Sequence, residues 1–234
     1  MKVLNRELVP PFDAFWDIFA SEIDVPTHLI ETGHRAVFGS ECYEEGSGRL
    51  PGWMELPDGP LSYHVAHELT HLLIQQRGFP TTMRGPQYDA DSHEARVGGD
   101  LMEMMHHHTL EDILSPFAFD RTHIQRHLFE GARRGIEMSP VPESGTPWWA
   151  TWACRFCELR YLLPREQWIR LEVVYDGRCP HIADKGRELA DIMLQEGYRT
   201  PDESLQAMIK VRDALGLREA DRCLVLDTRD GKRY

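Results

Sequence analysis

The chain has 234 residues, of which 41% are hydrophobic and 27% are charged, a balance typical of a globular protein rather than a disordered one. The 38 Asp and Glu residues outnumber the 26 Lys and Arg residues, which gives a net charge of -12. Since nucleic acids and anionic membranes attract basic surfaces, this charge argues against either of them as a general partner. A chain of this length can bury a sizeable core without help from disulfides or metals.

Nothing in the sequence indicates export or membrane insertion. The first residues, MKVLNRELVPPFD, include no apolar run of signal-peptide length. No later stretch approaches 18 uninterrupted apolar residues, so no transmembrane helix is expected. The 5 cysteines cannot all pair with one another, and without an export signal they are typical of reduced thiols. We therefore expect a cytoplasmic protein.

The N-terminal part of the chain is predicted to combine helices with short strands. Aromatic residues recur at helical spacing between Phe12 and Phe19, which predicts an amphipathic helix. The sequence PDGP at residues 57–60 is typical of a turn, and Gly78 and Pro80 are typical stop signals for a helix before them. The expected elements are a helix at 11–22, strands at 27–31, 35–39 and 52–56, and a helix at 62–76.

The rest of the chain is predicted to be mostly helical. Residues 139–147, SPVPESGTP, hold three prolines and a glycine, so they are the best internal boundary. We expect one domain at residues 1–138 and a mostly helical subdomain at 145–234. The fold class is a helix-rich α+β fold with a small antiparallel or mixed sheet on the N-terminal side. The expected elements are helices at 92–108, 119–135, 147–163, 181–197 and 202–215 and a strand at 223–227, with 166–175 ambiguous.

The chemistry of the chain is indicated by His67-Glu68-Leu69-Thr70-His71, an HExxH motif on the predicted 62–76 helix. Residues four apart lie on one face of a helix, so the two imidazoles can reach one metal ion. Glu68 projects about 100° further round, toward a metal-bound water. Imidazole suits zinc, which in catalytic sites has three protein ligands and a water. We predict that His67 and His71 bind Zn²⁺; the alternative is a pair of ordinary helix histidines.

A third zinc ligand has to come from further along the chain. The continuation found in metzincins fails, because Ile74 stands in place of its glycine and Arg77 in place of its histidine. The carboxylate and imidazole side chains available downstream are Asp89, Asp91, His93, Glu94, Asp100 and Glu103.

Helix geometry favours Glu94 among these candidates. At about 100° per residue, Glu94 shares one face of the predicted helix with apolar residues, whereas Glu103 lies on the opposite face and Asp100 well off it. Gly98 and Gly99 leave room for a close approach of the two helices. The alternative is that Glu94 is only a first-turn acid that complements the helix dipole. The apolar residues on its face are Val97, Leu101 and Met105.

The segments GWMELPDGPLSYHVAHELTHLL and SHEARVGGDLM resemble the gluzincins, in particular the compact ones. These are zinc metallopeptidases with HExxH on one helix and a zinc-binding glutamate on the next. The resemblance covers roughly residues 35–108 and implies a zincin-like catalytic domain over residues 1–138. It also implies that residues 52–56 form an edge strand that pairs with an extended peptide substrate. The roles it implies are zinc ligation by His67, His71 and Glu94, and general-base catalysis by Glu68.

Two features of larger gluzincins have no clear counterpart. Gly98 stands where they often place an aspartate, and Asp100, Asp89 or Asp91 would have to take its place in orienting a histidine. A downstream tyrosine or histidine that stabilises an oxyanion is not recognisable, and Tyr88 and the histidines at 106–108 are candidates by position only. The histidine run is predicted to be a solvated helix end, where positive charge suits the dipole.

Taken together, these patterns predict a zinc-dependent peptidase in which Glu68, as general base, takes a proton from a zinc-bound water that attacks the peptide bond. We expect a peptide or protein substrate and neither a nucleic acid nor a membrane partner. The alternative is a non-catalytic zinc-binding regulatory or interaction module that retains the metallopeptidase fold, because catalysis requires more than the metal ligands.

Two further clusters allow both a structural and a functional interpretation. Cys154 and Cys157 form a CxxC sequence that could hold a structural zinc with Cys179 and His181. They lie within a predicted helix rather than a turn, however, which favours buried thiols. The tryptophans at 148, 149 and 152 are expected to pack in the interior, with a peptide-binding aromatic wall as the alternative.

Overall fold

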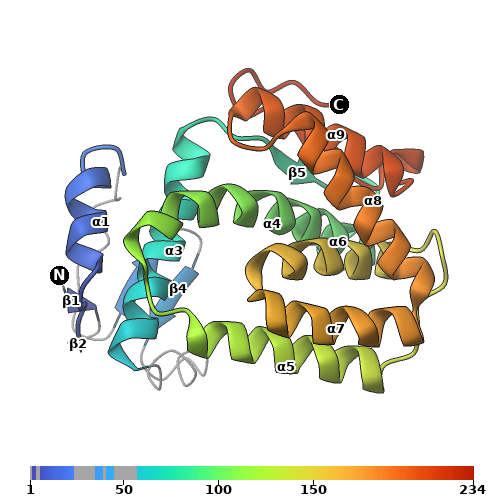
Figure 1. Cartoon of the computed structure of the whole chain (residues 1–234). Coiled ribbons are helices and arrows are strands. Elements are labelled where there is room, and N and C mark those ends of the chain that lie inside the picture. Colours follow the sequence, from blue (N-terminus) through green and yellow to red (C-terminus); the bar gives the residue numbers. More distant parts are fainter. Residues whose placement is uncertain (1, 4–5, 24–34, 39–40, 45–56) are drawn as a thin grey trace. The chain divides into compact units, whose positions relative to one another are not determined.

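The computed structural model describes residues 2–3, 6–23, 35–38, 41–44 and 57–234 (Figure 1). The strand predicted at 35–39 is confirmed by β3 (Arg35–Phe38), which pairs antiparallel with β4 (Glu41–Glu44). A second antiparallel pair joins β1 (Lys2–Val3) to β2 (Arg6–Glu7). The strands predicted at 27–31 and 52–56, the second of them the expected substrate-binding edge strand, lie outside the described residues.

Helices dominate the described part of the chain, so the helix-rich α+β class is confirmed. The ambiguous segment 166–175 lies within a helix, α7. Thr200 begins the last long helix with a capping box, in which its side chain accepts a hydrogen bond from the Glu203 amide. The helices are α1 (Phe12–Phe19), α3 (Asp58–Gln76), α4 (His93–Leu114), α5 (Thr122–Met138), α6 (Pro147–Leu162), α7 (Arg165–Arg178), α8 (Pro180–Glu196) and α9 (Pro201–Ala214), with short 3-10 turns at Ser115–Phe117 and Glu219–Asp221.

Three local predictions are wrong. The expected turn at residues 57–60 is largely the first turn of α3, where Pro60 is tolerated because the amides of a first turn have no partner within the helix. The helix predicted to end at residue 108 continues as α4 to Leu114. The stretch between the helices predicted at 62–76 and 92–108, where no strand was expected, contains β5 (Thr81–Met83), which pairs antiparallel with β6 (Leu224–Leu226). The strand predicted at 223–227 is thereby confirmed.

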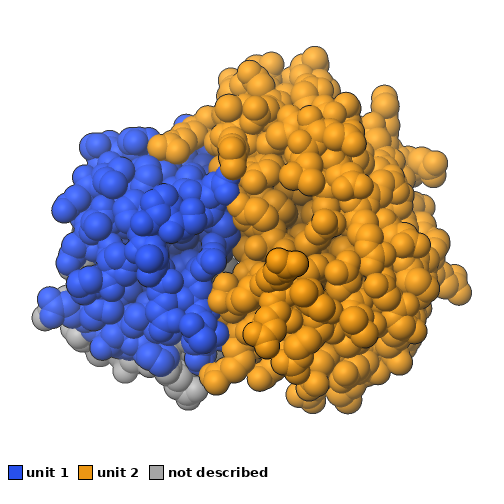
Figure 2. All heavy atoms as spheres, in the orientation of Figure 1, with its two compact units in different colours: residues 1–76, 110–124 blue, residues 77–109, 125–234 orange. Residues whose placement is uncertain are grey.

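The chain divides into two compact units (Figure 2). Unit 1 comprises residues 1–76 and 110–124, and unit 2 comprises residues 77–109 and 125–234. The boundary predicted at 139–147 therefore lies inside unit 2. The Pro-rich sequence there only separates α5 from α6, and the division falls instead at the end of α3 and within α4 and α5.

Unit 1 has an aromatic core. The rings of Phe12 and Phe15 on α1 are fully buried, as the helical spacing predicted. Phe15 makes edge-on contacts with Phe117 and Phe119, at centroid distances of 5.7 and 6.3 Å. Phe119 also contacts the ring of Tyr63, with centroids 6.1 Å apart, so this core extends to α3. One face of α3 is therefore held in the interior of unit 1.

Unit 2 has a larger core, built by α4 and by α6 to α9. α6 packs against α8, and Gly186 permits this close approach, because a Cβ there would lie 2.3 Å from the Phe156 ring. The thiols in this core are not in disulfides, and burial raises the pKa of Cys157 to about 12. The residues of the CxxC and tryptophan clusters that are buried here, as favoured from the sequence, are Trp149, Trp152, Cys154 and Cys157.

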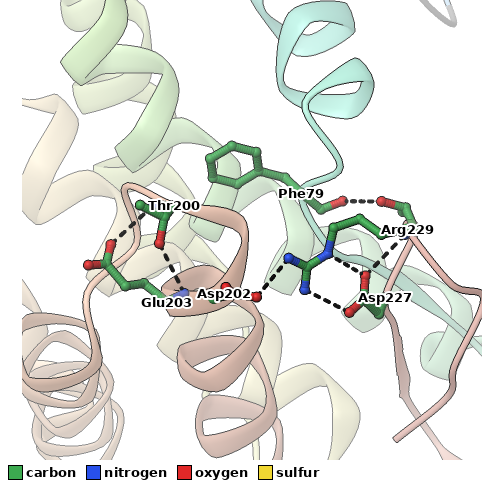
Figure 3. A network of polar contacts seen from close by, with 7 residues as sticks. Phe79, Thr200, Asp202, Glu203, Asp227 and Arg229 are labelled. Carbon is green, nitrogen blue, oxygen red and sulfur yellow. Dashed lines mark hydrogen bonds and ion pairs between the residues drawn. The ribbon is translucent and has the colours of Figure 1, made fainter.

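A polar network ties the segment after α3 to the C-terminal strand of unit 2 (Figure 3). Thr228 donates a hydrogen bond of 3.0 Å to the carbonyl of Phe79. Next to it, Arg229 bridges Asp227, at 2.8 Å, and Asp202 of α9, at 2.7 Å. Through these side chains, the residues after β6 bind both Phe79, which precedes β5, and α9, in addition to the backbone pairing of β5 with β6.

Within the described residues, none of the helices has the length and apolar character that crossing a membrane requires.

Candidate metal centre

The two histidines of the HExxH motif converge on one point beside α3. The Nε2 atoms of His67 and His71 are 3.2 Å apart, and their ring centroids are 4.9 Å apart at an interplanar angle of 74°. Both side chains are half-buried, as is Glu68 between them in sequence. The i, i+4 spacing thus brings two imidazole nitrogens together, as the sequence predicted.

This geometry fits a zinc ion. Two nitrogens bound to one tetrahedral zinc at about 2.0–2.1 Å are separated by roughly 3.3 Å. A bare pair of Nε2 atoms at 3.2 Å is favourable only if a proton or a cation lies between them, since two lone pairs repel each other. The two imidazoles are also donors that suit zinc better than calcium or magnesium, which prefer oxygen ligands.

The opposite face of α3 fixes the rotation of the motif. Val65, Leu69 and Leu73 on that face are almost completely buried. The Thr70 hydroxyl is also buried and donates a hydrogen bond of 2.7 Å to the carbonyl of Ala66. The one small polar side chain inside the motif therefore has its hydrogen-bond partner within the same helix. Because these side chains are locked in the interior, the histidines are presented on the remaining face.

A buried polar chain that the sequence analysis missed lies next to the histidine pair within unit 1. The ring of Tyr63 contacts that of His67, with centroids 5.8 Å apart. The Tyr63 hydroxyl donates a hydrogen bond to Glu111, which also forms an ion pair with Arg121. Burial raises the pKa of Tyr63 to about 12, against the opposing effect of Arg121, so the phenol remains protonated. Tyr63 stands four residues before His67, and that spacing could have identified it.

His64 is a second neighbour that the sequence analysis left out. Its ring is nearly parallel to that of His67, with centroids 6.4 Å apart and an angle of 12°. Burial lowers the pKa of His64 to about 4, so this imidazole is neutral at pH 7 and adds no positive charge beside the motif.

Glu94, the predicted third ligand, lies in the first turn of α4 within unit 2. Ser92 caps this helix, accepting a hydrogen bond of 3.1 Å from the Ala95 amide. Glu94 is half-buried and forms no ion pair or hydrogen bond with the described residues. Within unit 2, the Glu94 carboxylate is therefore available to bind a metal ion.

The other candidate ligands are either solvent-exposed or already engaged. Asp89, Asp91 and His93 are exposed. Asp100 accepts a hydrogen bond of 2.7 Å from Thr151 of α6. Glu103 pairs with His107 at 3.0 Å. Of the six candidate ligands, only Glu94 is half-buried and has a carboxylate without a hydrogen bond or ion pair to the described residues, so it remains the proposed third ligand.

The apolar face next to Glu94 enters the interior of unit 2. Val97, Leu101 and Met105 are fully buried, as predicted, and belong to the core formed with α6 to α9. Gly98 lies next to the strand β5: a Cβ at this position would lie 3.3 Å from the Thr82 hydroxyl, which donates a hydrogen bond to the carbonyl of Gly98.

The histidines at 106–108 are not a solvated helix end, because α4 continues past them. His106 is buried and donates a hydrogen bond of 2.9 Å to the Pro80 carbonyl. His108, also buried, donates to the Met104 carbonyl and stacks on Tyr161 at a centroid distance of 4.2 Å.

His107 connects two helices of unit 2 by ion pairs. Its Nδ1 lies 2.5 Å from Glu158 of α6, and its Nε2 lies 3.0 Å from Glu103. Burial alone would lower the pKa of His107, but the two carboxylates raise it to about 9. The ring is therefore an imidazolium at neutral pH.

Replacement of His106 with Gln should make the protein less sensitive to acid. Burial lowers the pKa of His106, against the opposing effect of its bond to Pro80, so only the unfolded chain takes up a proton below its ordinary value of 6.5. The stability of the folded state is therefore complete above pH 6.5 and is lost as the pH falls. Melting temperatures of both proteins from pH 7.5 to 5 test this, and equal slopes would contradict it.

Comparison with protein-family models, with curated proteins and with solved structures finds no match to this chain. The assignment of the metal centre therefore depends on the HExxH motif and on the geometry of α3 and α4, each within its own unit.

Proposed function

We propose that the chain is a zinc-dependent peptidase of the gluzincin type, in which His67 and His71 hold the metal, Glu94 completes the ligand set and Glu68 is the general base. The observation that carries this proposal is the pair of Nε2 atoms 3.2 Å apart on an HExxH helix. The substrate is a peptide or a protein, and no nucleic acid or membrane takes part.

Zinc held there would supply a Lewis acid that polarises a carbonyl and makes a bound water acidic. The Glu68 carboxylate accepts the proton of the attacking water and passes it to the leaving amine. Its place between the two histidines in sequence suits this role, because it shares their helix but projects about 100° away from His67 and so does not compete for the metal. Tyr63 supports His67 by packing and acts as a positioning residue.

One observation favours the second candidate function, a zinc-binding regulatory or interaction module without turnover. The side chains considered for stabilising an oxyanion are engaged in structural contacts: the Tyr88 hydroxyl donates to the Ala220 carbonyl at 3.0 Å, and the three histidines at 106–108 bind partners within unit 2. An enzyme that lacks such a donor loses a large part of its rate enhancement.

Two measurements on protein without a histidine tag distinguish these functions. Zinc content near one per chain together with hydrolysis of a broad peptide library supports the peptidase. Zinc at the same level with no hydrolysis supports the module. Protein that is folded, exposed to zinc and still free of metal contradicts both.

Replacement of Glu94 with Gln should weaken zinc binding at least tenfold. The change removes the charge of the third ligand while it keeps the size and the helix propensity of the side chain. Dissociation constants measured in competition with a chelator test this expectation.

Glu103→Gln is the matched control, because it makes the same change on the other side of α4, where the side chain is 44% exposed. This variant should bind zinc nearly as well as the wild type. Equal losses in both variants, or a larger loss in Glu103→Gln, would show that α4 presents a different face to the metal.

A further inference from the structure

Unit 2 contains a cavity of about 590 Å³ between α4, α5, α6 and α7. This volume lies in the range of small-molecule sites, which are typically apolar with a few convergent polar groups. The cavity has that composition. Trp148 and Trp152 of α6 and Ile136 of α5 line it with apolar surface, and a short row of charged residues from α4 and α6 lines the rest.

The aromatic part of the lining is accessible from outside. Trp152 is 9% exposed and Ile136 3%, whereas Trp148 is 37% exposed. A large apolar side chain that stays partly in solvent next to a cavity offers a ring face to a ligand. Such a face attracts cations as well as apolar groups, because the centre of the ring carries partial negative charge.

Most of the charged lining residues neutralise one another. His107 pairs with both Glu103 and Glu158. Glu158 also pairs with Arg155, at 2.6 Å. Burial alone would raise the pKa of Glu158, but these cationic partners lower it to about 2, so the carboxylate is fully ionised. The carboxylates and cations of this group are thus largely balanced within the protein.

Asp100 differs from the other charged residues of the lining, because no ion pair with the described residues neutralises its charge. Among the described residues that line the cavity, it is the carboxylate with no ion pair, and its recorded partner is the neutral hydroxyl of Thr151 at 2.7 Å. Burial raises the pKa of Asp100, although the Thr151 hydrogen bond and the more distant charges of Arg155 and Arg96 oppose this effect. A positively charged ligand would supply the direct ion pair that Asp100 lacks.

We propose that this cavity is a binding site for a small organic ammonium ion with an apolar body, whose charged group pairs with Asp100 and whose apolar part lies against Trp148 and Trp152. The lining favours a cation over an anion. The two ring nitrogens of His107 already face carboxylates, and the Arg155 guanidinium is paired with Glu158. The net charge of -12 adds a long-range attraction for cations.

Binding of three probes with similar bodies tests the charge requirement. They are 2-phenylethylamine, which is a cation at pH 7, 2-phenylethanol, which is neutral, and phenylacetate, which is an anion. Isothermal titration calorimetry with the full chain should show that the amine binds at least ten times more tightly than the other two. Equal affinities, tighter binding of phenylacetate, or no binding of the amine at millimolar concentration would overturn the proposal.

Asp100→Asn tests the residue. The amide keeps the shape and can still accept the Thr151 hydrogen bond, but it carries no charge. The amine should lose at least tenfold in affinity, while 2-phenylethanol should bind as before. Asp191→Asn is the matched control, because it removes one exposed carboxylate from α8, outside the cavity lining, and should leave both affinities unchanged. If both variants lost the same affinity for the amine, the attraction would be non-specific and the proposal would be rejected.

Gly135→Leu tests the location. Gly135 lines the cavity from α5, and a Cβ there would meet no heavy atom of the described residues within 4 Å. A leucine therefore enters the cavity, and it also has a higher helix propensity than glycine, so the variant should fold. Circular dichroism and melting temperature check the fold. The folded variant should bind neither the amine nor the alcohol; wild-type affinity for the amine would place its site elsewhere.

Discussion

Glu68→Gln should retain one zinc per chain and lose peptide hydrolysis by a factor of about 10² to 10⁴, the usual contribution of a general base. Glutamine has nearly the size of glutamate and can still hydrogen-bond a water, but it cannot accept a proton. The substitution changes neither the buried side chain of Leu69 nor the proposed ligand His67 on either side of it, so the helix should tolerate the change. Zinc content and the initial rate on the best substrate of a peptide library are the two measurements.

The control for this variant is Glu130→Gln, the same substitution at an exposed position of α5. It should leave both the rate and the metal content unchanged. If Glu68→Gln loses zinc, Glu68 is a ligand rather than a base. If it hydrolyses peptides at the wild-type rate, another residue accepts the proton.

His67→Ala and His71→Ala should each reduce bound zinc from about one to less than about one tenth per chain, because a catalytic zinc site seldom survives with only two protein ligands. The two substitutions should have similar effects, since the Nε2 atoms lie 3.2 Å apart and would bind the metal as a pair. Metal analysis after dialysis against a weak chelator measures the loss, and the melting temperature with and without added zinc gives a second reading. Zinc should raise the melting temperature of the wild type only.

His127→Ala provides the matched control, because it removes an exposed imidazole from another helix. Its zinc content should equal that of the wild type. Normal zinc content in either motif variant would show that the histidine pair does not bind the metal, and the peptidase proposal would then lose its main support.

The helices were predictable because their signals are local. The aromatic spacing of residues 12–19 and the stop at Gly78 each depend on neighbours within a few positions, and both agree with the structure. The histidine pair was predictable for the same reason, since four residues of helix alone bring the two rings together.

Long-range pairing was much less predictable. β5 consists of three residues, too few for a recognisable alternation, and its partner β6 lies more than a hundred residues further along the chain. The contact of Gly98 with β5 was not predictable either, because the sequence shows that a close approach is possible but not which element makes it. The Glu111–Arg121 ion pair next to Tyr63 gave no sequence signal, because charged residues at such positions are usually solvated.

The histidines at 106–108 show how the position of a helix end determines whether nearby side chains are solvated or buried. With α4 ending at residue 108, three imidazoles would lie in solvent and complement the dipole. Because the helix continues to Leu114, His106 and His108 are buried and His107 joins two helices. The error in position was six residues, and it reversed the expected environment of all three side chains.

The interleaving of the two units limits how this protein can be rearranged. Unit 1 needs residues 110–124, which are separated from residues 1–76 by a segment that belongs to unit 2. A single genetic breakpoint at residue 76 would therefore leave the HExxH helix without Glu111, Phe117 and Phe119, which bind or pack against its unit. The unit that contains the HExxH helix is thus not a transferable module, because it can be moved to another chain only together with residues 110–124.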